Sequence, residues 1–254
     1  MKALKCRISK NRVGIEASGA DTHITFDECD LLKNGSTNII VNTAATVRLD
    51  QSTCADSKGK GVAVLHPGSR LHATRSTFSG CATIGVHVSK ISSALLEHCS
   101  LQNNQISGAH VTDTGSVLNL EYCALSVNQT IGVFANKAGD VSLRHCTIVN
   151  NGSTGAEVRD RQSKMRLAHC SISDNKRVGV YSHSAAVATL VACVVKGNGV
   201  KAMLVGGREH VEMGGGLIEY DSATDIVGEI MARHSGRALE ANVESLTQSL
   251  SDDE

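Results

Sequence analysis

The stretch Leu143-Arg-His-Cys146-Thr-Ile148-Val-Asn-Asn151-Gly-Ser-Thr-Gly155-Ala decides the fold, because its pattern returns every 23 or 24 residues. An apolar residue stands three positions before the cysteine and another two positions after it. Asparagine follows five positions after the cysteine in most units, and a glycine comes a few residues later. The cysteine slot is filled in turn by Cys6, Cys29, Ser52, Ser76, Cys99, Cys123, Cys146, Cys170, Cys193 and Gly216. A fixed period of this length is typical of an array of stacked units.

Within each unit, apolar and polar residues alternate in short bursts, as in Val141-Ser-Leu143 and Val86-His-Val88. This is the period of a strand rather than of a helix. Asparagine tolerates the left-handed backbone of a tight turn, and glycine permits close approach of two backbones. We therefore interpret each unit as three short strands with Asn and Gly at the corners. The sequence predicts an all-β parallel β-helix of nine to ten coils, 23 to 24 residues each.

A leucine-rich-repeat-like solenoid is the alternative fold. The segment Leu118-Asn-Leu120-Glu-Tyr-Cys123-Ala-Leu125 fits the strand half of such a repeat. A leucine-rich repeat would continue to bury leucines on a helical segment, whereas this chain places Asn at the next corner and then another alternating strand. The second half of the unit therefore favours the β-helix.

Two domains are expected. Residues 1–224 form the repeat domain. From residue 225 the strand pattern stops, and Ala238, Leu239, Val243, Leu246 and Leu250 have helical spacing. We expect a helical cap over the last coil and an acidic tail in 225–254, with docking to a partner helix as the alternative.

At the other end, the first residues already belong to a coil, so the N-terminal coil has no obvious cap. An uncovered coil exposes apolar side chains and unpaired backbone groups. Either the chain is a piece of a longer protein, or something docks there, which includes self-association of two copies.

The pattern Leu-x-x-Cys-x-Ile-x-x-Asn followed by Gly-Val-x-Val resembles the right-handed parallel β-helix repeats of the pectin-lyase-like superfamily. It is most similar to the generic 23-residue version, which also occurs in F-box-associated β-helix adaptors. The resemblance covers roughly residues 1–221. It implies a right-handed coil, and it implies either protein recognition or processing of polysaccharides.

Composition argues against several classes of partner. The 25 basic and 25 acidic residues cancel, so bulk charge does not draw the chain to nucleic acid or to anionic membranes. No apolar run approaches the length of a membrane span, and the N-terminus has no signal-peptide core. We expect an intracellular, cytoplasmic protein without a cofactor.

The cysteine and asparagine columns have structural interpretations. The cysteines lie between inward-facing apolar positions, and nine of them cannot all pair. Reduced thiols packed as small apolar groups are expected, although stacked coils would bring their Cα atoms within disulfide range. The asparagines are expected to form a ladder, with each amide bonded to the amides above and below.

Outward-facing columns are where a function is expected. Two columns on the strand after the glycine bring together side chains that can accept or donate a hydrogen bond, carry charge and stack. The competing interpretation is a solvated strand face on which Glu157 and Arg159 pair weakly. The candidate binding face consists of His87, His110, Phe134, Asn136, Glu157, Arg159, Tyr181 and His183.

A second outward column places Glu97 and Glu121 on adjacent coils. Paired carboxylates are the catalytic groups of glycosidases, but on an open face a charged ladder is the favoured interpretation, and Glu97 and Glu121 are weak catalytic candidates. A third column holds His98, Tyr122, His145 and His169. His145 and His169 could share a metal ion, but without a third ligand they make a weak site.

These observations favour a non-catalytic scaffold that binds a protein partner, as a substrate-recognition or adaptor module. The alternative is a carbohydrate-binding or polysaccharide-processing protein with its groove on the His87–His183 face; as an enzyme it would be a polysaccharide lyase or glycoside hydrolase. The catalytic motifs of the pectate lyases and polygalacturonases do not occur here. The chain also has no Trp and only three Tyr and three Phe, whereas sugar-processing grooves use aromatic platforms.

Overall fold

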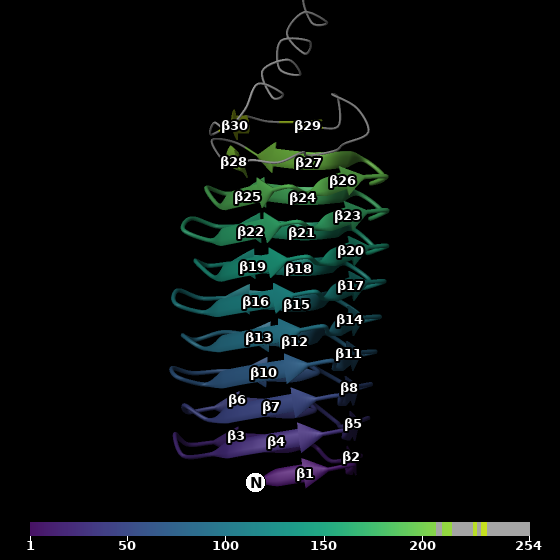
Figure 1. Ribbon diagram of the computed structural model, residues 1–254, viewed down its shortest axis with the longest axis vertical. Helices are drawn as coiled ribbons and strands as arrows, with labels where there is room; N and C mark the ends of the chain where they lie inside the picture. Colours follow the sequence, from purple (N-terminus) through teal and green to yellow (C-terminus); the bar gives the residue numbers. More distant parts are fainter. Residues whose placement is uncertain (207–209, 215–225, 228–229, 233–254) are drawn as a thin grey trace, which may run out of the picture.

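The computed structural model describes residues 1–206, 210–214, 226–227 and 230–232. In these residues the chain winds as a coil whose three sides are parallel β-sheets, and successive coils stack along one axis (Figure 1). The described residues form strands and turns but no helix. Consequently they contain no helical segment that is long and apolar enough to cross a membrane.

Each sheet takes no more than one strand from a coil. Sheet A comprises β1 (Lys2–Leu4), β4 (His23–Asp27), β7 (Thr46–Asp50), β10 (Arg70–Thr74), β13 (Ser93–Glu97), β16 (Val117–Glu121), β19 (Asp140–Arg144), β22 (Lys164–Ala168), β25 (Val187–Val191), β28 (His210–Gly214) and β30 (Ile230–Ala232). Sheet B comprises β2 (Arg7–Ser9), β5 (Asp30–Leu32), β8 (Thr53–Ala55), β11 (Thr77–Ser79), β14 (Ser100–Gln102), β17 (Ala124–Ser126), β20 (Thr147–Val149), β23 (Ser171–Ser173) and β26 (Val194–Lys196). Sheet C comprises β3 (Ile15–Ser18), β6 (Ile39–Asn42), β9 (Val62–Val64), β12 (Ile84–Val88), β15 (Ser107–Thr112), β18 (Ile131–Asn136), β21 (Thr154–Arg159), β24 (Val178–His183), β27 (Lys201–Gly206) and β29 (Ile226–Val227).

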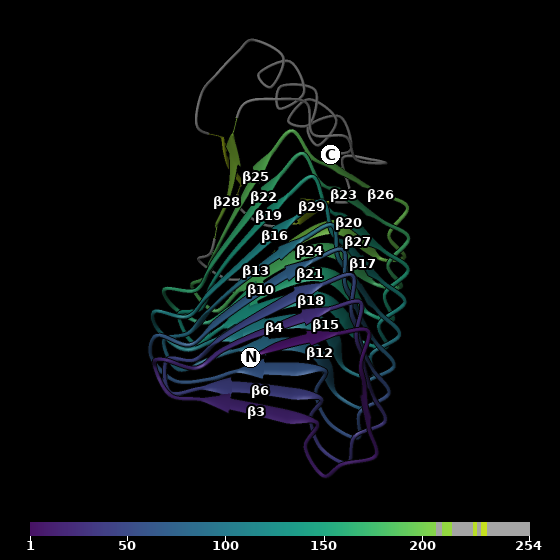
Figure 2. The same ribbon diagram turned by 60° about the horizontal axis from the view of Figure 1, so that its bottom comes forward.

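The register between coils follows the sequence period. Leu120 pairs with Leu143, and Leu143 with Leu167, so equivalent positions stack directly. The inward residues of the three sheets join in one hydrophobic core that includes Phe26, Phe78 and the stacked leucines. Figure 2, tilted toward the coil axis, shows the three sheets as the three sides of the coil, with the short strands of sheet B forming one side. The predicted parallel β-helix is confirmed.

The leucine-rich-repeat alternative is wrong, because the second half of each unit is a strand of sheet C rather than a helix. Among the described residues, nine coils carry a strand in all three sheets. The tenth slot, Gly216, lies outside the described residues.

The asparagine column forms the predicted ladder at the corner between sheets B and C. Asn151 Oδ1 accepts hydrogen bonds from the backbone N and the Nδ2 of Asn128, at 3.1 and 3.0 Å. Asn151 Nδ2 donates to Leu125 O of the preceding coil at 3.1 Å and to Asn175 Oδ1 of the following coil at 2.9 Å. Because Asn151 is fully buried, these partners replace the water that its amide loses on folding.

Glycine at the start of the sheet C strands makes room for this ladder. A Cβ atom on Gly132 would lie 2.6 Å from the carbonyl oxygen of Gly155 and 2.9 Å from Asn151 Nδ2. Both distances are shorter than van der Waals contact. The Asn and Gly columns are therefore parts of one close-packed corner.

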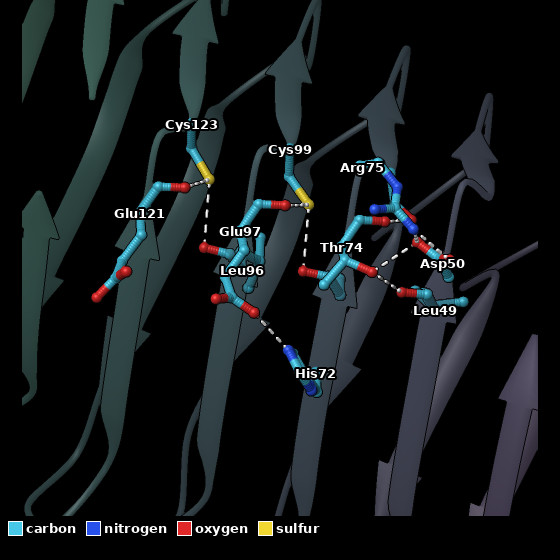
Figure 3. Close-up of polar contacts among 12 residues, drawn as sticks. Leu49, Asp50, His72, Thr74, Arg75, Leu96, Glu97, Cys99, Glu121 and Cys123 are labelled. Atoms are coloured by element: carbon cyan, nitrogen blue, oxygen red, sulfur yellow. Dashed lines mark hydrogen bonds and ion pairs between the residues drawn. The ribbon is translucent and has the colours of Figure 1, made fainter. Parts of the chain in front are cut away.

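The cysteine slot supplies a hydrogen-bond donor to the backbone at the corner between sheets A and B. Cys99 Sγ donates to Glu97 O at 3.3 Å and to Ala73 O of the preceding coil at 3.4 Å (Figure 3). Ser76 Oγ makes the equivalent bond to Thr74 O at 2.8 Å. Serine and cysteine thus exchange because both are small donors, and all nine cysteines are free thiols.

The gaps of 23 and 24 residues are explained at the turns between sheets C and A. The longer coils carry the turns 66–69, 113–116 and 160–163, each of which ends in serine. Each serine Oγ accepts a hydrogen bond from a backbone N–H of the shorter turn before it, as in Ile91 N to Ser116 Oγ at 3.0 Å. Long and short turns therefore interlock in pairs.

The helix expected in 225–254 does not occur in those residues of the segment that the structure describes. Residues 226–227 form β29 and residues 230–232 form β30, which pair with β27 and β28. Ile226, Val227 and Ile230 are β-branched residues that favour strands, so apolar spacing alone misled the prediction. The remaining predicted helix and the acidic tail lie outside the described residues, and the division at 224/225 stays a prediction.

We predict that Asn151→Ala lowers the free energy of unfolding by about 3 kcal/mol, because several buried polar groups lose their partners. Thermal or urea unfolding measures the change. Asn119→Ala, at an exposed position on sheet A, is the control and should change stability little. Equal stability of Asn151→Ala and the wild type would contradict the ladder.

We also predict that a thiol reagent modifies one cysteine rapidly in the native protein. Cys6 is exposed and the other eight are buried, and burial raises the pKa of the Cys54 thiol well above its usual range. The eight should react only after unfolding, and Cys6→Ser should remove the rapid phase. Rapid modification of several thiols in the native protein would disprove the packing of the column.

Candidate functional site

The sequence-predicted binding face lies on the outer side of sheet C. His87, His110, Phe134, Glu157 and Tyr181 occupy equivalent positions on five successive coils. Asn136, Arg159 and His183 stand two residues further along β18, β21 and β24. We call these eight residues the sheet C band. Their side chains project outward because the residues between them, such as Ala135 and Val158, enter the core.

Rings and a guanidinium group are in contact along the lower part of the band, from His87 to Phe134. The ring centroids of His87 and His110 lie 5.1 Å apart in an edge arrangement, and those of His110 and Phe134 lie 4.7 Å apart in a stack. The Arg159 guanidinium carbon lies 4.8 Å from the centroid of Phe134. His110 Nε2 also contacts Asn136 Oδ1 at 3.0 Å. Phe134 therefore contacts His110 of the preceding coil and Arg159 of the following coil.

The side chains at the other end of the band, from Glu157 to His183, are joined by a contact between a carboxylate and an imidazole and by a second stack. Glu157 Oε1 lies 3.3 Å from His183 Nε2, and only 13% of the Glu157 side chain is exposed. The rings of Tyr181 and His183 stack at 4.3 Å. The competing sequence interpretation paired Glu157 with Arg159, but Glu157 contacts His183 and Arg159 lies over Phe134 instead.

Burial keeps the lower histidines of the band uncharged. Desolvation lowers the pKa of His87 to about 3, and the nearby His110 and Lys60 add to the effect. Desolvation also lowers the pKa of His110, against the hydrogen bond that His110 Nε2 donates to Asn136 Oδ1, which favours the charged form. Both rings are neutral at physiological pH, and each then has one donor and one acceptor nitrogen, of which His110 Nε2 is used in the contact with Asn136.

The two glutamates proposed as weak catalytic candidates lie on the outer side of sheet A. Glu97 and Glu121 are paired positions of β13 and β16. Glu97 Oε2 contacts His72 Nε2 at 2.7 Å (Figure 3). Glu97 therefore contacts a histidine of the preceding coil. This contact agrees with a charged ladder along the outer side of sheet A.

Two partners of this outward column, His72 and Arg75, were not predicted from the sequence. Asp50 accepts hydrogen bonds from Thr74 Oγ1 at 2.7 Å and from Arg75 Nη2 at 2.6 and 2.8 Å (Figure 3). These bonds lower the pKa of Asp50. His72 and Thr74 share the outward register of β10, so the sequence period places both on the same face as Glu97. Their contacts could not be predicted, because these depend on which side-chain rotamers meet across coils.

The third outward column forms a stack of four rings at the corner between sheets A and B. Centroids of His98, Tyr122, His145 and His169 follow one another at 5.0, 4.8 and 4.9 Å, with interplanar angles of 10° or less. His145 and His169 are therefore parallel, and their in-plane lone pairs do not point at a common metal position. In the part of the chain that the structure describes, no three His, Cys, Asp or Glu side chains gather closely enough to hold a metal ion.

We predict that stability falls with acid in a way that depends on His87. Below pH 6.5 the unfolded chain binds a proton at this ring that the folded chain excludes down to about pH 3, so stability is lost as pH decreases through this window. Between about pH 8 and about pH 5 the loss from His87 is about 2 kcal/mol. Chemical unfolding of wild type and His87→Gln at both pH values measures this difference. His98→Gln, at an exposed ring, should behave as the wild type, and a His87→Gln protein with the wild-type pH dependence would refute the prediction.

Comparison with solved structures finds similar coils in larger proteins. A periplasmic alginate epimerase, AlgG, is 15% identical, with a TM-score of 0.59 over 82% of this chain and 62% of the epimerase chain. A pectate lyase is 10% identical, with a TM-score of 0.51 over 85% of this chain and 66% of the lyase. Tailspike protein 2 from an Escherichia coli O157:H7 bacteriophage is 9% identical, with a TM-score of 0.65 over 89% of this chain and 38% of the tailspike. These similarities establish a shared fold alone.

This chain thus spans about three fifths of the length of the epimerase. No curated protein matches it. The family model for the right handed beta helix region matches residues 2–135 and 123–222, which together cover most of the sequence. The chain therefore belongs to the right handed beta helix region family.

Proposed function

We propose that this protein binds a polysaccharide along the sheet C band. The observation that carries the proposal is two neighbouring clusters of contacting side chains, one of His87, His110, Phe134, Asn136 and Arg159 and the other of Glu157, Tyr181 and His183, which together extend over five coils. Sugars present apolar C–H faces and many hydroxyl groups, which rings and neutral donor or acceptor groups can contact. The band runs along the stacking axis, so an extended polymer could contact several coils at once.

The structural similarities support this class of ligand. Two of the solved structures with this coil are described as an alginate epimerase and a pectate lyase, so their substrates are polysaccharides. Shared fold is an argument by analogy, and the argument for this chain depends on the band itself. We propose binding rather than turnover, because the carboxylates considered for catalysis, Glu97 and Glu121, lie on sheet A and not beside the band.

A protein-binding scaffold is the second candidate function. It is favoured by the exposed side chains of Ile106 and Val127 near the corner between sheets B and C. The backbone carbonyl of Ile106 accepts bonds from the coil that contains Val127, so the two residues belong to adjacent coils. Such a site would lie beside the asparagine ladder, away from the sheet A glutamates.

Affinity electrophoresis and a polysaccharide array test the first proposal. We expect Tyr181→Ala to weaken binding about tenfold, because a stacked ring contributes on the order of 1 kcal/mol. Tyr122→Ala is the matched control, since Tyr122 is also stacked but lies in the corner column, with 52% of its surface exposed. Equal losses in the two variants would refute the band as the site. Binding to no polysaccharide would leave the scaffold function, and new reducing or unsaturated ends would indicate a lyase or hydrolase.

A further inference from the structure

Arg159 is the exposed cation of the sheet C band. Arg7, Arg75 and Arg166 each form an ion pair with an aspartate. None of the ion pairs formed within the described residues includes Arg159. Its guanidinium group lies over the ring of Phe134 instead. Its positive charge is therefore not neutralised by a carboxylate in direct contact.

The carboxylates closest to Arg159 in the sequence have other partners. Glu157 contacts His183 at 3.3 Å and is largely buried. Asp160 Oδ2 accepts a hydrogen bond from the backbone N of Lys137 at 3.2 Å, which joins two turns. Both carboxylates thus have structural contacts that hold them away from the guanidinium group.

Phe134 holds the guanidinium group in position. A cation placed over a ring face is attracted by the electrons of the ring, and this contact restricts the long arginine side chain before any ligand arrives. The planar guanidinium group keeps donors that can form two parallel hydrogen bonds to a carboxylate or a sulfate. An ordered, unpaired arginine is well suited to bind an anion.

The surroundings of Arg159 favour an anion over a cation. His87 and His110 are neutral, and the charges that act on them are the positive ones of Lys60 and Arg159 and, on His110, the smaller opposing effect of the negative Asp113. Glu157 is the only acidic member of the eight-residue band, and it is paired with His183. A ligand group with negative charge would therefore meet a positive site at the centre of the band.

We propose that Arg159 binds an anionic substituent, a carboxylate or a sulfate, of the polysaccharide that lies along the sheet C band. This inference depends on the proposed function, since it names the chemical class of the same ligand. Carboxylate and sulfate groups both present a pair of oxygens that can accept the two parallel hydrogen bonds of the guanidinium group, and the experiment distinguishes the two.

The wild-type protein is first screened on an array of neutral polysaccharides, polyuronates and sulfated polysaccharides. The best anionic polymer is then titrated beside its own neutral form, which is the carboxyl-reduced polymer for a polyuronate or the desulfated polymer for a sulfated one. We expect the neutral form to bind at least tenfold more weakly, in line with the loss of a charged hydrogen bond. The preferred polymer class identifies the anion.

Arg159→Ala should weaken binding of the anionic polymer by the same factor and should leave binding of its neutral form unchanged. Arg159→Lys should lie between, because lysine keeps the charge but loses the planar pair of donors. Arg166→Ala, which removes an exposed arginine from sheet A, is the matched control for non-specific attraction and should have no effect. Thermal unfolding of each variant verifies that it is folded.

Three outcomes would overturn the inference, and those that affect Arg159 alone remain distinguishable from the one that affects the proposed function. Equal binding of the anionic and neutral forms, or equal losses in Arg159→Ala and Arg166→Ala, would remove the role of Arg159 while polysaccharide binding stands. Binding to no polymer in the array would overturn the proposed function, and the role of Arg159 with it.

Discussion

The buried asparagine ladder is the interaction on which the rest of the structure depends. A primary amide that leaves water must find partners for its oxygen and its nitrogen. In this fold the partners belong to the coils above and below, as Asn128, Asn151 and Asn175 illustrate. The ladder therefore fixes both the height of each coil and the rotation of one coil on the next. The glycines permit this spacing, because a Cβ atom at Gly132 would collide with the ladder.

Fixed register turns distant sequence positions into neighbours on the surface. His110 and Asn136 are 26 residues apart and are in hydrogen-bond distance. Phe134 meets a ring from one coil and a guanidinium group from another. The side chains of the band bury one another, which explains why two of its histidines stay neutral. The band is thus an ordered surface with one ring-held arginine at its centre.

Much of the fold could be predicted from the sequence, because the periodic positions are also the buried ones. Cys146, Ile148 and Asn151 recur since each fills a core or corner position that every coil needs. The outward columns followed from the same count, so the members of the band were identified correctly as neighbours. Their contacts could not be predicted: Glu157 and Arg159 look like an ion pair by spacing, yet rotamers and burial bring Glu157 to His183. The strands at 226–227 and 230–232 also escaped prediction, because apolar spacing over so few residues fits a helix equally well.

The central claim is that the sheet C band is the polysaccharide-binding surface. NMR chemical-shift mapping with a bound oligosaccharide tests it most directly, because it places the ligand without altering the protein. The account predicts that the largest shifts occur at residues of β15, β18, β21 and β24, including the side chains of Phe134, Arg159 and Tyr181. Shifts confined to the sheet A face around His72 and Glu97, or to the corner at Ile106 and Val127, would contradict the claim.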